Sequence, residues 1–193
     1  MMQNSKDNIR QKLLQTGRRL AAEKGAAFLT ARKLSEASGC SIGTIYNQFA
    51  SMDDFIAEQN ELTLDELYAY LSQLGGQPHG YRNINLYADF FRQFVASNRQ
   101  LWFLFYNFHL NLNGYRLSIG YRRRLVKFGC LLRPDLTAMF PRIGIKRLKT
   151  SQKVLETALT ALSALSAANG GSDNRSALLL NTYLAGMMML NKE

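Results

Sequence analysis

Residues 30–49 read TARKLSEASGCSIGTIYNQF, and the fold is decided by this stretch. Thr30 is suited to cap one short helix, Gly39 to end it, and Ser41 to cap a second helix that runs to Phe49. Two short helices around a tight turn are the sequence form of a helix-turn-helix, whose second helix lies in the major groove of DNA. The stretch therefore predicts a DNA-binding motif over residues 30–49.

The second of these helices has an apolar side and a polar side. Ile45 and Phe49 are four residues apart, so they share one side, which we expect to pack on Leu34 and the first helix. The opposite side is polar and includes a glycine, which lets the backbone approach a phosphate strand closely. It presents Gly43, Thr44, Tyr46, Asn47 and Gln48.

Two residues of this helix could be either buried in the core or exposed to DNA. Ile42 precedes Ile45 by three residues and fits the core equally well; if it is exposed, it is suited to the methyl group of thymine. Tyr46 has a polar tip on an apolar body, so its ring can either be buried or face the DNA.

Composition favours a soluble globular chain with an anionic partner. The chain has 193 residues, is 47% hydrophobic and carries 24 Lys+Arg against 14 Asp+Glu, a formal charge of +10. The charge is concentrated in residues 1–50 and 101–150. Two cysteines suit a reducing cytosol, and the first residues contain no apolar run of a secretory signal. The longest apolar stretch, residues 176–190, is short for a bilayer, so we expect a cytoplasmic protein with no membrane span.

Helical periodicity extends along the chain, and no run shows the sustained alternation of a strand. The step from Arg133 to Pro134 disfavours helix and is expected to end one element. We therefore expect an all-α protein of about nine helices. The expected helices cover residues 5–25, 30–39, 41–49, 51–74, 81–98, 99–111, 115–132, 145–168 and 173–190.

Residues 29–55, LTARKLSEASGCSIGTIYNQFASMDDF, resemble the DNA-binding domain of bacterial TetR-family transcriptional regulators. The shared features are a Thr before the second helix, a Gly at the turn, a Gly-Thr-hydrophobic-Tyr core and a Phe that closes the recognition helix. An acidic and hydrophobic start of the fourth helix follows. The resemblance covers about residues 5–60; beyond them only the length, the helix count and the apolar final helix pair are similar.

The resemblance implies a role for each matching residue. Thr30 would cap the second helix and touch a phosphate, and the hydroxyl of Tyr46 would bind another. The family usually has Lys where this chain has Met52, so Ser51 and the amides of the helix start would contact the DNA backbone without that anchor. The implied DNA-binding residues are Thr30, Arg32, Ser41, Ile42, Gly43, Thr44, Tyr46, Asn47, Gln48 and Ser51.

Residues 81–115 are rich in aromatic side chains. They are either the core of a second domain or, as the resemblance implies, part of an apolar pocket for a small-molecule effector. Arg116, Arg123 and Lys127 form one stripe, which is either a solvated face or a site for an anionic effector. The expected ligand-binding residues are Phe90, Phe94, Trp102, Phe105, Tyr106, His109 and Arg123.

The last two expected helices are nearly uncharged, and a single protomer would expose much of their apolar surface. In the resembled family two helices from each protomer form a four-helix bundle, which implies a homodimer here. The expected dimerisation residues are Leu155, Leu159, Leu162, Leu179, Tyr183, Gly186, Met187 and Leu190.

Enzymatic and metal-dependent functions have weak support in the sequence. Gly39-Cys-Ser-Ile-Gly43 fits the G-x-S-x-G pattern of hydrolases, but that motif requires a preceding strand and here the preceding segment reads as helix. Neither clustered Cys nor a His-x-x-x-His spacing occurs, so we expect no catalytic residue, no metal and no cofactor.

These patterns predict a DNA-binding domain over residues 1–50 and a helical effector-binding and dimerisation domain over residues 51–193. The predicted function is a homodimeric transcriptional regulator, a repressor that a small molecule releases from a palindromic operator in double-stranded DNA. The alternative is a basic protein that associates with anionic membrane or nucleoid surfaces without sequence preference.

Overall fold

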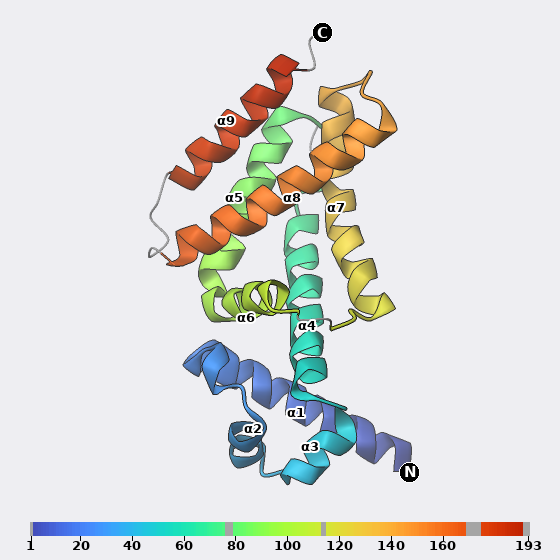
Figure 1. The fold of residues 1–193 in the computed structure, drawn as a ribbon, viewed down its shortest axis with the longest axis vertical. Helices are drawn as coiled ribbons and strands as arrows, with labels where there is room; N and C mark the ends of the chain where they lie inside the picture. The colour runs from blue at the N-terminus through green and yellow to red at the C-terminus, as the bar shows by residue number, and fades with distance from the viewer. Residues whose placement is uncertain (1, 76–78, 113–114, 169–174, 191–193) are drawn as a thin grey trace. The chain divides into compact units, whose positions relative to one another are not determined.

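The fold is all-α, in a computed structural model that describes residues 2–75, 79–112, 115–168 and 175–190. Over those ranges there is no strand, and no helix there is both long and apolar enough to cross a membrane. Figure 1 shows the elements, which are α1 (Met2–Lys24), the 3-10 turn η1 (Ala26–Phe28), α2 (Ala31–Ser38), α3 (Ile42–Gln48), α4 (Met52–Ser72), α5 (Tyr81–Ser97), α6 (Arg99–Leu110), α7 (Ile119–Met139), α8 (Ile145–Ala168) and α9 (Arg175–Leu190).

The chain divides into two compact units, each made of two segments. The first unit contains Met1–Thr63 and Asn98–Tyr121, and the second contains Leu64–Ser97 and Arg122–Glu193. The boundaries fall within α4, after Thr63, between α5 and α6, after Ser97, and within α7, after Tyr121.

The first unit is built around one hydrophobic core. Helix α1 contacts α2, α3 and α6, and η1 packs against both α1 and α6. Phe49 and Phe55 meet edge to face with ring centroids 4.8 Å apart, a favourable arrangement of aromatic rings. The buried residues of this core are Leu13, Ala21, Leu29, Leu34, Ile45, Phe49, Phe55, Leu101 and Leu104.

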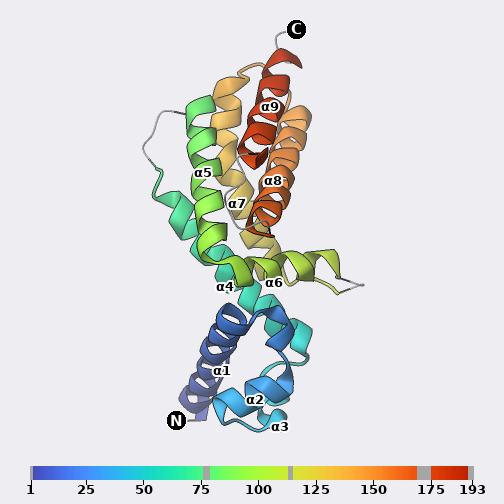
Figure 2. The ribbon, with the colours of Figure 1, turned by 90° about the vertical axis from the view of Figure 1, so that its left-hand side faces the viewer.

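In the second unit, α5, α8 and α9 contact one another, as Figure 2 shows. Phe91 of α5 packs against Phe128 of α7, with ring centroids 5.5 Å apart. Apolar side chains of all four helices are fully or almost fully buried; they include Ile84, Phe91, Leu132, Leu136, Leu155 and Leu184.

Helix α7 differs most from the expectation drawn from the sequence. It begins at Ile119, four residues late, and continues through Pro134 to Met139 instead of ending near Leu132. Proline disfavours a helix interior, but here the helix continues because the turn after Pro134 is buried. Asp135 and Leu136 in that turn are inaccessible to solvent. Asp135 also caps α5, since its Oδ1 accepts the N–H of Gly80 at 2.9 Å.

The other differences are smaller. Helix α1 begins at Met2, before the expected residue 5, and the short turn η1 was not expected. The predicted break between the last two helices, at Gly170-Gly171 and Ser172, lies outside the described residues.

Candidate nucleic-acid interface

Side-chain caps fix the starts of both α2 and α3. The Oγ1 of Thr30 accepts the N–H of Lys33 at 3.3 Å, and the Oγ of Ser41 accepts the N–H of Thr44 at 3.0 Å. Between them Gly39 ends α2 in the left-handed region, at φ 70°, where a side chain would be strained. The helix-turn-helix predicted from residues 30–49 is therefore present.

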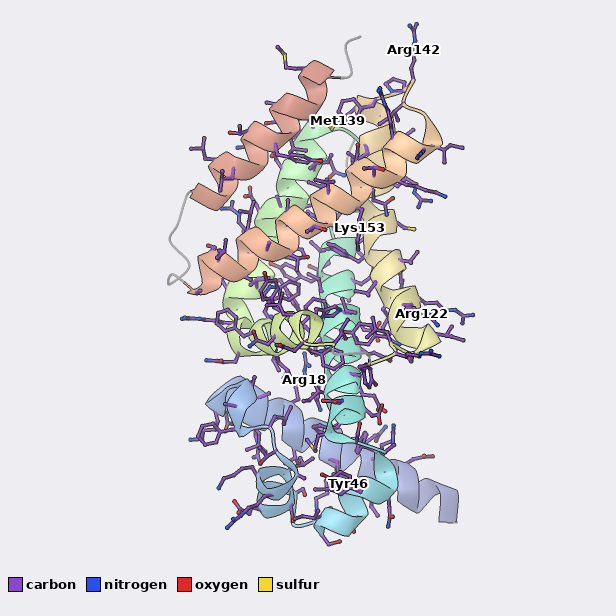
Figure 3. All side chains as sticks on the ribbon, in the orientation of Figure 1. Arg18, Tyr46, Arg122, Met139, Arg142 and Lys153 are labelled. Atoms are coloured by element: carbon purple, nitrogen blue, oxygen red, sulfur yellow. The ribbon has the colours of Figure 1, made fainter. Side chains whose placement is uncertain are left out.

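Helix α3 buries one side and exposes the other. Ile45 is 0% exposed and Phe49 is buried beside it, whereas Ile42 is 45% and Tyr46 is 47% exposed. Ile42 and Tyr46, which the sequence allowed to be either buried or exposed, thus both lie at the surface. Figure 3 labels Tyr46 on α3. The helix is oriented by its apolar side, which packs into the core of the first unit.

The exposed side of α3 offers polar groups without charge. Gly43 and Asn47 are exposed, and Thr44 and Gln48 are half-buried. The hydroxyl of Thr44 lies 2.8 Å from the Oγ of Ser41, so part of its hydrogen-bonding capacity serves the helix cap. Asn47 is exposed, and its amide is of the kind that can pair in two-point fashion with adenine.

Arg10 of α1 holds α3 against α4. Its guanidinium donates hydrogen bonds to the carbonyl of Gln48 and to the carboxylate of Glu58, and it lies 4.3 Å above the ring of Phe49. Burial raises the pKa of Glu58, and the positive charge of Arg10 opposes that rise. Sequence reasoning missed this residue, because no spacing links position 10 to positions 48 and 58.

Helix α2 carries two exposed cations that share one carboxylate. Lys33 Nζ lies 2.8 Å and Arg32 Nε 3.1 Å from Glu36, and these hydrogen bonds, that of Lys33 first, lower the pKa of Glu36. Such exposed pairs are weak, so both cations can exchange Glu36 for a DNA phosphate at little cost. Arg32 was expected to reach the DNA backbone, and Lys33 joins it as a candidate.

Ser51 caps the start of α4 through its side chain. The Oγ of Ser51 accepts the N–H of Asp54 at 3.0 Å and donates to its Oδ2 at 2.8 Å, while Met52 packs against the core. The other oxygen of Asp54 accepts the hydroxyl of Tyr115 at 2.8 Å. Ser51 is therefore already hydrogen-bonded, and a phosphate contact would have to replace or share these bonds.

The family comparison agrees with this geometry. Residues 13–58 match the model described as "Bacterial regulatory proteins, tetR family". Residues 13–58 form a TetR-family DNA-binding domain. No curated protein sequence matches the chain.

Several solved structures are similar in fold to most of this chain at low sequence identity. RolR in complex with resorcinol has a TM-score of 0.69 at 17% identity, over 97% of this chain and 89% of that one. FadR from Bacillus subtilis in complex with stearoyl-CoA has a TM-score of 0.63 at 14% identity, over 91% and 95%. The fatty acid degradation regulator FadR from Bacillus halodurans has a TM-score of 0.64 at 15% identity, over 87% and 92%.

Ser41, the central residue of the hydrolase-like pattern, lies within the TetR-family domain. The element before it is helix α2, so the strand that a nucleophile elbow requires is replaced by a helix. Over the described ranges, no group of three or more His, Cys, Asp or Glu side chains could hold a metal ion.

The expected ligand-binding residues fall outside the TetR-family domain and in both compact units. Phe90 and Phe94 both pack against Tyr70 in the second unit, where Arg123 is exposed. In the first unit the rings of Trp102, Phe105 and His109 follow one another along α6, with centroids 4.8 and 4.2 Å apart. Tyr106 of α6 is half-buried.

The expected dimerisation residues differ in exposure. Leu155 and Leu159 of α8 are buried within the chain and Leu162 is partly buried. On α9, Leu179 and Gly186 are exposed and Tyr183 is partly buried. The side chains of Met187 and Leu190 lie outside the described part of the chain.

Proposed function

We propose that the chain is a transcriptional regulator that binds a specific sequence in double-stranded DNA through the exposed side of α3. The observation that carries this proposal is the division of α3 into a buried apolar side, with Ile45, and an exposed polar side, with Asn47. A helix fixed by its apolar side can present the other side to base edges in the major groove. Arg32 and Ser51 would position the domain on the phosphates.

We propose that the regulator acts as a homodimer on a palindromic operator. Two copies of α3 would enter major grooves about one helical turn, or about 34–36 Å, apart. The exposed apolar side chains of the last two helices support this assembly, because a monomer would leave them in water. They are Val154 and Leu165 of α8 and Leu178, Leu179 and Met189 of α9.

We further propose that a small-molecule effector releases the protein from its operator, which would make it a repressor in the cytoplasm. The structures of RolR with resorcinol and of FadR with stearoyl-CoA support ligand binding, because both proteins share this fold. The aromatic side chains of α6 offer apolar surface for such a ligand. A ligand with different affinities for the DNA-bound and the DNA-free protein would shift the equilibrium between these two states.

Selection of binding sites from random double-stranded DNA tests the proposal. We expect the purified chain to enrich a two-fold symmetric sequence at physiological salt. Enrichment of no sequence, together with equal binding to anionic vesicles and to any DNA, would contradict the proposal. That outcome would favour the alternative of a basic protein on anionic membrane or nucleoid surfaces.

A further inference from the structure

Most of the net positive charge of the chain lies on α7 and the first half of α8, outside the DNA-binding domain. Residues 122–155 contain ten Lys or Arg and one acidic residue, a formal charge of +9 out of the +10 of the chain. Residues 13–58, which form the TetR-family domain, contain five Lys or Arg and five Asp or Glu, so that domain has no formal net charge. The excess of cations that predicts an anionic partner is therefore a property of another part of the molecule.

Four of these cations form a basic patch at the start of α8, which consists of Arg142, Lys146, Lys149 and Lys153. All four side chains are exposed, and no acidic residue occurs between positions 136 and 155. The three lysines are three and four residues apart, so they share one side of the helix. Figure 3 labels Arg142 and Lys153, and the Arg142 side chain extends away from the ribbon.

The basic patch occupies its own side of α8. Leu155 and Leu159, on the apolar side, are buried within the chain, and Val154 and Leu165 belong to the surface proposed for the dimer. Successive residues of a helix are rotated by about 100°, which places Val154 on a different side from Lys153. The patch is therefore exposed beside the proposed dimer surface and is not part of it.

Folding does not explain these cations. Lys153 Nζ lies 3.7 Å from the carboxylate of Glu156, and over the described ranges no salt bridge involves Arg142, Lys146 or Lys149. The first turn of α8 has no acidic residue, although the positive end of the helix dipole disfavours cations there. Like charges three or four residues apart also repel each other. The patch lowers the stability of α8 on both counts, so its cations are better explained by binding than by folding.

The phosphates of double-stranded DNA match the patch in charge. Proteins bind DNA of any sequence mainly through Lys and Arg at the phosphates, because each contact releases condensed counterions. The TetR-family domain has no net charge, so it attracts DNA only weakly over a distance. The basic patch supplies the attraction that this domain lacks.

An anionic membrane fits the patch less well. A helix that binds a bilayer surface inserts its apolar side among the lipids. The apolar side of α8 is already occupied, since Leu155 and Leu159 are buried within the chain. Of the large apolar side chains at residues 142–153, Ile145 alone is exposed, and one isoleucine gives little insertion.

We propose that the basic patch of α8 binds the phosphate backbone of double-stranded DNA, independently of base sequence and separately from α3. Phosphate contacts carry no sequence information, and lysine suits them because it acts as a point charge. The binding itself does not depend on the proposed function. Its purpose, to hold the regulator on DNA outside its operator, rests on that function.

Binding of a random-sequence duplex to the full chain at several salt concentrations tests the patch. The triple variant Arg142→Gln, Lys146→Gln, Lys149→Gln removes three of its charges. Each phosphate contact contributes about 0.9 to the slope of log K against log salt, so we expect a slope shallower by about 2–3. We also expect the affinity at about 50 mM salt to fall by about tenfold or more. Fluorescence anisotropy measures both, and an unchanged slope would overturn the proposal.

Two comparisons separate binding by the patch from other effects of the substitutions. The triple variant should be at least as stable as the wild-type chain in urea, because it removes repulsion within α8. The matched variant Arg82→Gln, Arg122→Gln, Arg123→Gln removes three exposed charges elsewhere in the second unit, and its slope should change by less than about 1. Equal changes of slope in the two variants would show only an effect of net charge and would overturn the proposal.

Sedimentation with vesicles of phosphatidylglycerol and phosphatidylcholine tests a membrane as the partner. We expect the patch variant and the wild-type chain to differ little in vesicle binding at physiological salt. A variant that loses vesicle binding but keeps its affinity for the random-sequence duplex would identify a membrane surface and overturn the proposal.

Selection of binding sites from random DNA separates this proposal from the proposed function. We expect the patch variant to select the same operator as the wild-type chain, because α3 is unchanged. If the wild-type chain selects an operator but the patch variant keeps the wild-type salt slope, only the patch proposal fails. If the slope falls as expected but the wild-type chain selects no sequence, the patch stands and the proposed regulator function fails.

Discussion

At the scale of single residues, two isoleucines of α3 have opposite environments. Ile45 is inaccessible to solvent and belongs to the core, while Ile42 is exposed at the first turn of the helix. The sequence predicted the burial of Ile45 because Phe49 repeats it one turn later. The sequence did not decide whether Ile42 is buried or exposed, because a residue three positions before Ile45 can share its face of the helix.

Replacing each isoleucine by alanine should separate the two sides of α3. We expect Ile45→Ala to lower the free energy of unfolding by about 2–4 kcal/mol, because it opens a cavity in the core. Ile42→Ala should change it by less than about 0.5 kcal/mol, since the side chain is exposed. Urea denaturation measures both, and a similar loss in the two variants would mean that α3 is not oriented as described.

The carboxylate of Glu36 competes with DNA for Arg32 and Lys33. Replacement by Gln should release both cations and increase DNA affinity by up to about fivefold, the equivalent of one exposed ion pair. Fluorescence anisotropy with the selected operator measures this change. Glu23→Gln removes the same charge from an exposed position of α1 and should have a smaller effect; equal gains would indicate only a general effect of net charge.

At the scale of elements, the helices of the DNA-binding domain were predictable because their signals are local. Thr30, Gly39 and Ser41 act within a few residues of themselves, and the structure places all three at helix ends. Helix α7 was predicted wrongly because its continuation depends on burial of Asp135 and Leu136, which involves other elements. The Arg10 contacts were missed for the same reason.

Pro134 should cost α7 stability that alanine restores. Proline in a helix interior lacks the amide donor and costs about 3 kcal/mol, part of which its stiffening of the unfolded chain offsets. We expect Pro134→Ala to raise the free energy of unfolding by about 1–3 kcal/mol in urea denaturation. Pro141→Ala, outside the helix, serves as the control. A loss of stability in Pro134→Ala would show that the proline is required by the bend or packing of α7.

At the scale of the whole molecule, the proposed dimer depends on the exposed apolar surface of α8 and α9. Leu179 is 55% exposed within the chain. The sequence predicted an apolar final helix pair, but it could not distinguish Leu155, which the chain itself buries, from Leu179. Both positions fit an apolar stripe, and only the packing of α8 against α5 and α9 separates them.

A charge placed on this surface should dissociate the dimer. We expect the wild-type chain to sediment at twice its mass of 21.9 kDa and Leu179→Glu to sediment as a monomer, because a buried unpaired carboxylate is costly. Val126→Glu makes the same change at an exposed position of α7 and should remain a dimer. A wild-type monomer, or a dimer in both variants, would exclude this surface as the interface.

The central claim is that the exposed side of α3 reads base edges. Its most direct test repeats the selection from random DNA with Asn47→Ala and compares the enriched sequence with that of the wild-type chain. We expect the base preference to relax at one symmetric pair of positions, with about 1–3 kcal/mol of discrimination lost there and the rest of the sequence unchanged. An enriched sequence identical to that of the wild-type chain would contradict base reading by Asn47.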